Sequence, residues 1–285
     1  MKKNILIACF TATVIFLNLS CKKDGTNDNG TKAVFSYVSD GFIVNFKDYS
    51  TNAKEYSWDF GDAGTSTKAN PVHIYHSKGE FLAKLTITNG TNTSEFIDTV
   101  YVAGPNIKID GDFTDWTYVD YSHTNEGTTG GTLLAVKTFA SAAALNFYVE
   151  GTEDLNLTLI DLLIDADNNT ATGFQFWMYP IASGADFLCE GSPVGGWGSG
   201  YTHAGGDNNG WTWESAFDFD GTIKFSEIKE VDGKKVVEFS IKRSALGVQK
   251  DFVNFALQEL DAGYTIVGTI PAAAESTSAF AKIKL

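Results

Sequence analysis

Short runs in which apolar and polar residues alternate recur along the chain, and turn-forming residues separate them. The segment 81–88, Phe-Leu-Ala-Lys-Leu-Thr-Ile-Thr, is typical of a strand with one buried face. Turn pairs such as Asp40-Gly41 and Asn89-Gly90 lie between such runs. The pattern predicts an all-β protein, with strands over 34–38, 42–46, 81–88, 96–102, 133–136, 145–149, 157–164, 235–241, 252–257, 264–270 and 280–285.

The strand pattern breaks at Gly104-Pro105 and restarts at Ile107. Proline interrupts strand pairing, so this dipeptide marks a domain boundary. Residues 33–104 are predicted to form a small β-sandwich. Residues 105–285 show no strong helical pattern beyond a short candidate at 242–246, and they predict a larger β-sandwich or jelly roll.

The first 20 residues resemble a bacterial lipoprotein signal peptide. Lys2 and Lys3 precede an apolar run over 5–19, and Ser20 stands directly before Cys21. The run is shorter than the roughly 20 residues of a transmembrane helix. The resemblance implies cleavage before Cys21 and lipidation of that cysteine, although Asn18 stands where the usual motif has Leu. A plain secretory signal or an uncleaved anchor is the alternative, and the polar residues 21–32 predict a flexible tether.

Residues 33–103 resemble the PKD domain family. The resemblance rests on the segment 56–62, Tyr-Ser-Trp-Asp-Phe-Gly-Asp, then on Asn70-Pro71, His73, Tyr75, Gly79 and the run 85–89, Leu-Thr-Ile-Thr-Asn. It implies a small Ig-like sandwich. Trp58 and Phe60 alternate inward as expected core residues. Asp59, Asp62 and His73 could form a site, but turn hydrogen bonding is the interpretation that short acceptors at such positions favour.

The second domain resembles the family 9 carbohydrate-binding modules. The opening segment 109–116, Ile-Asp-Gly-Asp-Phe-Thr-Asp-Trp, and the loop 165–173, Asp-Ala-Asp-Asn-Asn-Thr-Ala-Thr-Gly, carry most of the resemblance, and 184–188, Gly-Ala-Asp-Phe-Leu, adds to it. The family implies a β-sandwich that holds sugar with aromatic side chains, in some members with structural calcium. Trp116, like Trp58, is expected in a core.

The loop after the apolar run 157–164 carries alternating oxygen donors at Asp165, Asp167 and Asn169. Hard oxygen ligands at this spacing suit Ca²⁺, which takes six to eight of them. The loop lacks the Gly and Glu that an EF-hand requires at its sixth and twelfth positions. A solvated turn capped by its own Asp and Asn side chains is the alternative, so calcium binding here is a hypothesis.

Aromatic residues crowd into one part of the second domain. Trp197 and Tyr201 lie in the glycine-rich segment 191–210, which reads as an open loop and therefore predicts exposed rings. Flat exposed rings suit the C–H faces of pyranose sugars, and Asp207 is a candidate polar partner. Trp211 and Trp213 are expected to share one face of a strand, inward or outward. The predicted carbohydrate-binding residues are thus Trp197, Tyr201, Trp177, Trp211, Trp213 and Asp207.

Charge and cysteine content narrow the function classes. The chain has a formal net charge of −14, which becomes two units more negative if the leader is removed. Such a surface repels phosphate backbones, so nucleic acid is not an expected partner. After removal of the leader and lipidation of Cys21, Cys189 is alone and cannot form an internal disulfide. Beside Leu188 it is expected to be a small buried residue rather than a nucleophile.

These features predict a lipid-anchored, non-catalytic glycan-binding protein on the outer membrane, facing the cell surface, in which the first domain is a spacer. The membrane contact is through the lipid on Cys21, and the ligand is a polysaccharide or oligosaccharide. One alternative is a structural or adhesive lipoprotein that contacts outer-membrane proteins. The other is an unrecognised glycoside hydrolase, whose two carboxylates a single sequence does not reveal.

Overall fold

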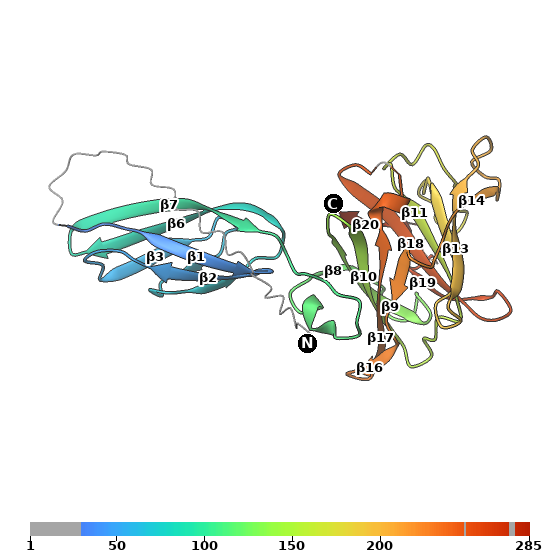
Figure 1. The fold of residues 1–285 in the computed structure, drawn as a ribbon, viewed down its shortest axis with the longest axis horizontal. Helices are drawn as coiled ribbons and strands as arrows, with labels where there is room; N and C mark the ends of the chain where they lie inside the picture. The colour runs from blue at the N-terminus through green and yellow to red at the C-terminus, as the bar shows by residue number, and fades with distance from the viewer. Residues whose placement is uncertain (1–29, 248, 274–276) are drawn as a thin grey trace, which may run out of the picture.

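The computed structural model describes residues 30–247, 249–273 and 277–285, and it confirms the all-β fold class. Two β-sandwiches lie end to end along the long axis of the molecule (Figure 1). The predicted signal peptide, Cys21 and most of the tether lie outside the described residues. None of the described residues forms a helix long and apolar enough to cross a bilayer.

The first sandwich contains two antiparallel sheets. One has the strand order β1 (Phe35–Asp40), β2 (Ile43–Asp48), β5 (Val72–Ile74), and the other β4 (Thr65–Ser66), β3 (Glu55–Asp59), β6 (Gly79–Asn89), β7 (Asn92–Val102). Trp58, Phe60 and Tyr75 are buried between the sheets, with exposed fractions of 1% or less. The Trp58 indole N–H donates to the Lys68 carbonyl at 2.8 Å, which satisfies the polar atom of this buried ring. The expectation that Trp58 is a core residue is confirmed.

The second sandwich also pairs two antiparallel sheets. The first follows the order β15 (Ile223–Phe225), β17 (Lys234–Lys242), β10 (Ala144–Gly151), β9 (Leu133–Ala140), β8 (Tyr121–Thr124), with β16 (Lys229–Val231) also on β17. The second follows β14 (Trp213–Asp218), β13 (Trp197–His203), β12 (Phe187–Ser192), β11 (Leu159–Asp165), β18 (Phe252–Leu260), β19 (Ile266–Ile270), with β20 (Ala281–Lys284) on β18. We call this second, seven-stranded sheet the binding-side sheet.

The two sheets enclose a core in which Phe147 and Phe239 stack with centroids 4.5 Å apart and Phe255 meets Phe147 edge-on at 5.2 Å. The binding-side sheet is covered on its other face as well. Phe174, Phe176 and Tyr179 form a separate buried cluster there with Leu163, Leu188 and Ala256 of the sheet. The segment 174–179 therefore lies over the outer face of the sheet and positions the residues discussed below.

The opening motif of the second domain is anchored by one buried carboxylate. Glu238 of β17 has no exposed surface, and its oxygens accept the backbone N–H groups of Asp110 and Gly111 and the indole N–H of Trp116, at 2.8, 2.7 and 2.9 Å. Trp116 lies in the short 3-10 turn η1 (Phe113–Trp116), capped by Asp112, and is fully buried, as expected from the sequence.

The two sandwiches contact each other directly. Phe42 of the first meets Phe139 of the second edge-on at 6.1 Å, and the Lys78 ammonium donates to the Ala140 carbonyl at 2.9 Å. Gly104 lies between them with φ +80, and a Cβ there would stand 2.5 Å from the Phe139 ring. This close approach explains why glycine precedes Pro105 at the boundary.

Candidate carbohydrate-binding site

Two exposed indoles form a corner at one end of the binding-side sheet. The side chains of Trp177 and Trp211 are 71% and 47% exposed. Their ring centroids lie 6.1 Å apart, and the ring planes are inclined at 59°. Contiguous exposed apolar surface of this kind is a feature of interaction sites. We call this pair the tryptophan corner.

The tryptophan corner is built on buried aromatic residues. The ring of Phe174, fully buried, lies 5.9 Å from Trp177 and 5.1 Å from Trp211, and it meets both edge-on. Phe176 packs against Trp177 at 4.9 Å. Because edge-to-face contacts fix ring orientation, the open faces of both indoles are held in place rather than free to collapse.

The loop that carries Trp211 is tied to the segment that carries Trp177. The Gln175 N–H donates to the Asn208 carbonyl at 2.7 Å, and the Asn208 side chain donates to the Ala171 carbonyl at 2.9 Å. Asp207 is exposed on the same loop, and its carboxylate accepts the Asn209 N–H at 2.9 Å. The predicted polar partner Asp207 therefore caps its own turn beside the tryptophan corner.

Trp213 is near the tryptophan corner but is only partly exposed. It packs against Phe174 at 5.6 Å and Trp211 at 5.6 Å, and its indole nitrogen is buried without a hydrogen-bond partner among the described residues. The prediction that Trp211 and Trp213 share a strand is wrong. Trp213 begins β14, whereas Trp211 lies in the preceding loop and is turned outward.

The glycine-rich segment 191–210 is not an open loop, which corrects a second prediction. It contains the end of β12 and the whole of β13. Glycine is required there by packing: a Cβ at Gly198 would lie 2.3 Å from Phe219, and one at Gly200 would lie 2.1 Å from Phe217. The glycines make room for two phenylalanines of the core, and the composition of the segment concealed a regular strand.

Trp197 and Tyr201 consequently lie on β13, on the face of the sheet away from these phenylalanines. Trp197 is 51% exposed, but Tyr201 is partly buried against the Phe174 cluster, so its prediction as an open platform is wrong. Trp197 is six residues from His203, the register partner of Trp213. At about 3.3 Å per residue, Trp197 is roughly 20 Å along the sheet from the tryptophan corner.

Three carboxylates meet where the 165–173 loop leaves β11. Oxygens of Asp165, Asp167 and Asp186 all lie within 4.8 Å of one another. Asn169, predicted as the third ligand, instead directs its side-chain oxygen to its own turn, accepting the Ala171 N–H at 3.3 Å. Asp186, twenty-one residues along the chain from Asp165, takes its place because β12 pairs with β11.

The acidic trio has the electrostatics of a cation site. Burial raises the pKa of Asp165 and of Asp186, and the charges of the neighbouring carboxylates add to both shifts. Asp186 also accepts the N–H groups of Ala166 and Asp167 at 2.9 and 3.1 Å, which fixes its orientation. Three oxygen donors at this separation fit a Ca²⁺ ion, which would relieve their mutual repulsion. A pocket of about 320 Å³, lined in part by Asp167, Asp186 and His203, adjoins them.

The PKD-like motif uses its polar residues for structure. Asp59 and Asp62 accept the N–H groups of Gly61 and Gly64, and Asp62 pairs with His73 at 2.7 Å. Burial acts to raise the pKa of Asp62, but the hydrogen bonds from His73 and Gly64 outweigh it and lower that pKa. The turn-bonding interpretation agrees with this geometry.

Cys189 is fully buried, which raises the pKa of its thiol and leaves it unsuited to nucleophilic chemistry.

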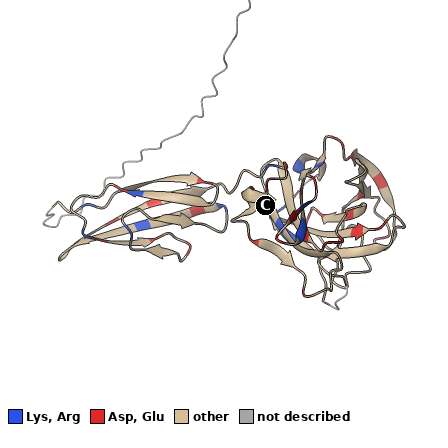
Figure 2. Cartoon of the chain, turned by 90° about the horizontal axis from the view of Figure 1, so that it is seen from below, with Lys and Arg blue, Asp and Glu red and all other residues tan. Residues whose placement is uncertain are grey.

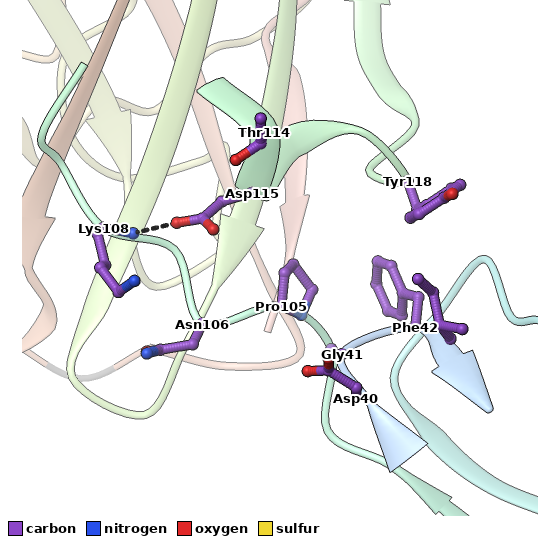
Figure 3. A pocket seen from close by; sticks show the side chains of 11 residues that line it. Asp40, Gly41, Phe42, Pro105, Asn106, Lys108, Thr114, Asp115 and Tyr118 are labelled. Carbon is purple, nitrogen blue, oxygen red and sulfur yellow. Dashed lines mark hydrogen bonds between the residues drawn. The ribbon is translucent and has the colours of Figure 1, made fainter. Parts of the chain in front are cut away.

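A groove of about 410 Å³ follows the junction between the sandwiches (Figure 3). Phe42, Pro105 and Tyr118 line it, and the Asp115 carboxylate accepts the Lys108 N–H at 3.0 Å across it. This hydrogen bond joins the linker to η1, and the groove lies at the domain junction.

Comparison with known proteins gives a family match for the first domain. Residues 24–103 match the PKD domain family. Curated proteins with short matches include collagenase ColA of Bacillus cereus, 50% identical over 40 residues (13% of this chain and 4% of the relative), and collagenase ColQ1 of Bacillus cereus strain Q1, 34% identical over 89 residues (27% and 9%). The chain spans less than a tenth of the length of either collagenase.

Solved structures similar to this chain include the PKD1 domain of the Vibrio cholerae metalloprotease PrtV, with 29% identity, 26% of this chain, 96% of that chain and a TM-score of 0.25. Another is a family 9 carbohydrate-binding module from Caldicellulosiruptor kristjanssonii in complex with cellotriose, with 15% identity, 63% of this chain, 89% of that chain and a TM-score of 0.34. Residues 24–103 are similar to PKD domains, and a larger β-sandwich follows them.

Proposed function

We propose that the second sandwich binds carbohydrate, without cleaving it, through the tryptophan corner. The observation that carries the proposal is the pair of open indole faces, Trp177 and Trp211, held on a buried Phe174. Pyranose rings present C–H groups that stack on such faces, and fixed rings lose little conformational entropy on binding. Trp213 and Asp207 border the same surface.

The inclination of the two rings bears on the kind of glycan. Planes at 59° cannot both lie on one flat face. The tryptophan corner therefore suits a single chain or a chain end rather than the surface of a crystalline polysaccharide. Acidic residues lie on both domains (Figure 2), and the net charge of −14 favours uncharged sugars over uronic-acid polymers.

We also propose that the protein is held by a lipid on Cys21 at the outer membrane and faces the cell surface. Support for this comes from the leader pattern of residues 1–20 and the polar residues that follow it. The PKD-type domain would then be a spacer, and its direct contact with the second sandwich through Phe42 and Phe139 suits that role. Capture at the surface would concentrate glycan for separate enzymes or a transporter.

Calcium at Asp165, Asp167 and Asp186 is a further part of the proposal. The role would be architectural, because the trio fixes the 165–173 loop, and that loop is bonded to the loop of Trp211 through Ala171 and Asn208. A bound cation would thus stabilise the support of the tryptophan corner without touching the sugar.

Affinity electrophoresis of the mature chain tests the central proposal. Gels containing β-glucan, xylan, galactomannan or polygalacturonate should retard the wild type in at least one neutral polymer. The double substitution Trp177→Ala/Trp211→Ala should abolish the retardation. Tyr49→Ala, which removes a 60% exposed aromatic of the first domain, is the matched control and should migrate like the wild type. Absence of retardation in every gel would contradict carbohydrate binding.

One observation favours the adhesive alternative. Leu82, Ile97 and Tyr101 are 65%, 55% and 60% exposed and lie on the outer face of the β6–β7 pair, opposite the buried Leu85 and Val100. An apolar strip beside the sheet edge is suited to contact with another protein. Retention of an outer-membrane protein by the mature chain, lost on Leu82→Lys and indifferent to added sugar, would support that role.

A further inference from the structure

A row of polar side chains crosses the outer face of the binding-side sheet. The strand register places Gln258 opposite Asp161, Asp161 opposite Glu190, and Glu190 opposite Ser199. Their chain neighbours Leu162, Cys189 and Leu257 belong to the core between the sheets. Because side chains alternate along a strand, the four polar groups share the opposite face. Spaced by about 4.8 Å per strand, they form a row roughly 14 Å long.

The row contains a buried carboxyl group that lacks a partner. Asp161 is 7% exposed, and no donor among the described residues reaches its Oδ1 atom. Next to it, Gln258 is 2% exposed, and its side-chain amide donates to the thioether sulfur of Met178 at 3.3 Å. A thioether is a weak acceptor, so two adjacent buried groups are poorly satisfied by the protein. A buried polar group without a hydrogen-bond partner destabilises the folded state unless a ligand or water supplies the missing hydrogen bond.

The row opens toward solvent at its other end. Glu190 and Ser199 are partly exposed, and the Ser199 hydroxyl donates to the Asp218 carboxylate at 3.4 Å. Trp197 and Tyr201 lie two residues to either side of Ser199 on the same strand, and therefore on the same face. Met178 at the closed end directly follows Trp177 of the tryptophan corner. The row therefore has aromatic side chains near both of its ends.

We propose that the row Gln258–Asp161–Glu190–Ser199 is a second subsite, which binds the hydroxyl groups of an uncharged sugar unit in line with the tryptophan corner. The inference rests on the proposed carbohydrate binding and adds to it the polar contacts and a ligand class. Carboxyl oxygens accept hydroxyl hydrogens, and the negative charge of Glu190 disfavours uronic acids, sulfates and phosphates. The half-exposed face of Trp197 covers the same sugar chain beyond the row.

Isothermal titration of the full mature chain tests the subsite. The probes are cellotriose, xylotriose, laminaritriose and mannotriose, the polysaccharides used for affinity electrophoresis, and trigalacturonate as the anionic comparison. Glu190→Ala should weaken binding of a neutral probe about tenfold, the loss expected for one charge-assisted hydrogen bond. Glu230→Ala removes an exposed carboxylate of β16, on the other sheet, and is the matched control. Asp161→Asn, which keeps the volume of the side chain, is the second variant, and thermal melts show whether each variant is folded.

The outcomes separate the subsite from the function on which it rests. Weaker binding by Glu190→Ala and Asp161→Asn, with Glu230→Ala unchanged and trigalacturonate unbound, supports the subsite. Wild-type affinity in both folded variants, combined with loss of binding in Trp177→Ala/Trp211→Ala, overturns the subsite and leaves the proposed function standing. If no probe binds the wild type, both fail. Release of reducing sugar that Glu190→Ala abolishes would also overturn it, because the carboxyl pair would then be hydrolytic.

Discussion

Asp161 and Glu190 face each other across β11 and β12, and Asp161 is the buried member of the pair. Burial, with the charge of Glu190 as a second cause, raises the pKa of Asp161 to about 7. Gln258, the other neighbour of Asp161 in the row, carries no charge that would lower that pKa.

This pKa predicts a pH dependence of stability. The unfolded chain releases the Asp161 proton near pH 4, so the folded state loses relative stability as pH rises from about 4 to 7, and the loss is complete above the folded pKa. Asp161→Asn cannot ionise and should raise the free energy of unfolding at pH 8 by on the order of 2 kcal/mol, or roughly 4–8 °C. Thermal melts of both proteins at pH 4 and pH 8 measure this. A gain of equal size at both pH values would contradict the ionisation.

Calcium should stabilise the second sandwich. Calcium at about a hundred times its dissociation constant would raise the free energy of unfolding by about 2.7 kcal/mol. This corresponds to a melting temperature roughly 5–10 °C higher. Asp186→Asn should remove the effect, and Asn169→Ala should leave it largely intact because Asn169 directs its side-chain oxygen to Ala171. Melts with calcium and with chelator give the comparison. Equal melting temperatures in the two buffers would rule out an architectural ion.

The Glu238 carboxylate should stabilise the second domain. Glu238→Ala leaves the N–H groups of Asp110 and Gly111 and the indole N–H of Trp116 without their acceptor in a buried position. We expect a loss of about 3 kcal/mol in the free energy of unfolding, measured by urea denaturation. Glu230→Ala provides the control, and a difference below about 0.5 kcal/mol between the two variants would be inconsistent with the anchor.

Overpacking on β13 provides a test of the corrected strand assignment. A Cβ at residue 200 would lie 2.1 Å from Phe217, so Gly200→Ala should destabilise by about 1–3 kcal/mol. In the double variant Gly200→Ala/Phe217→Leu, leucine replaces the phenylalanine ring and should restore part of the lost stability. If residue 200 were in an open loop, as composition suggests, the effects of the two substitutions on the free energy of unfolding would simply add in a double-mutant cycle.

The fold class and many strand positions could be predicted from the sequence because alternation of apolar residues reports the buried face of a strand directly. The expectation that Trp58 and Trp116 lie in a core rests on the motifs that carry them, and both are buried. The segment 191–210 was misread because glycine is typical both of loops and of strands under large aromatic side chains. Only the positions of Phe217 and Phe219, which come later in the chain, distinguish the two cases.

Sites that depend on strand pairing were harder to predict. Asp186 joins Asp165 and Asp167 only because β12 returns alongside β11, and Asn169 is closer in sequence but directed elsewhere. Asp161 is visible in the sequence as an acid inside the apolar run 157–164. The strand register places Glu190 and Gln258 beside that acid, and the register is known only from the folded sheet.

The most direct test of carbohydrate binding is isothermal titration calorimetry with soluble neutral polysaccharides. The mature wild-type chain and Trp177→Ala/Trp211→Ala are compared. Exothermic, saturable binding of the wild type to at least one glycan, absent in the double variant and retained in Tyr49→Ala, is the predicted result. Binding that survives removal of both indoles, or no heat with any glycan, would contradict the assignment of the tryptophan corner.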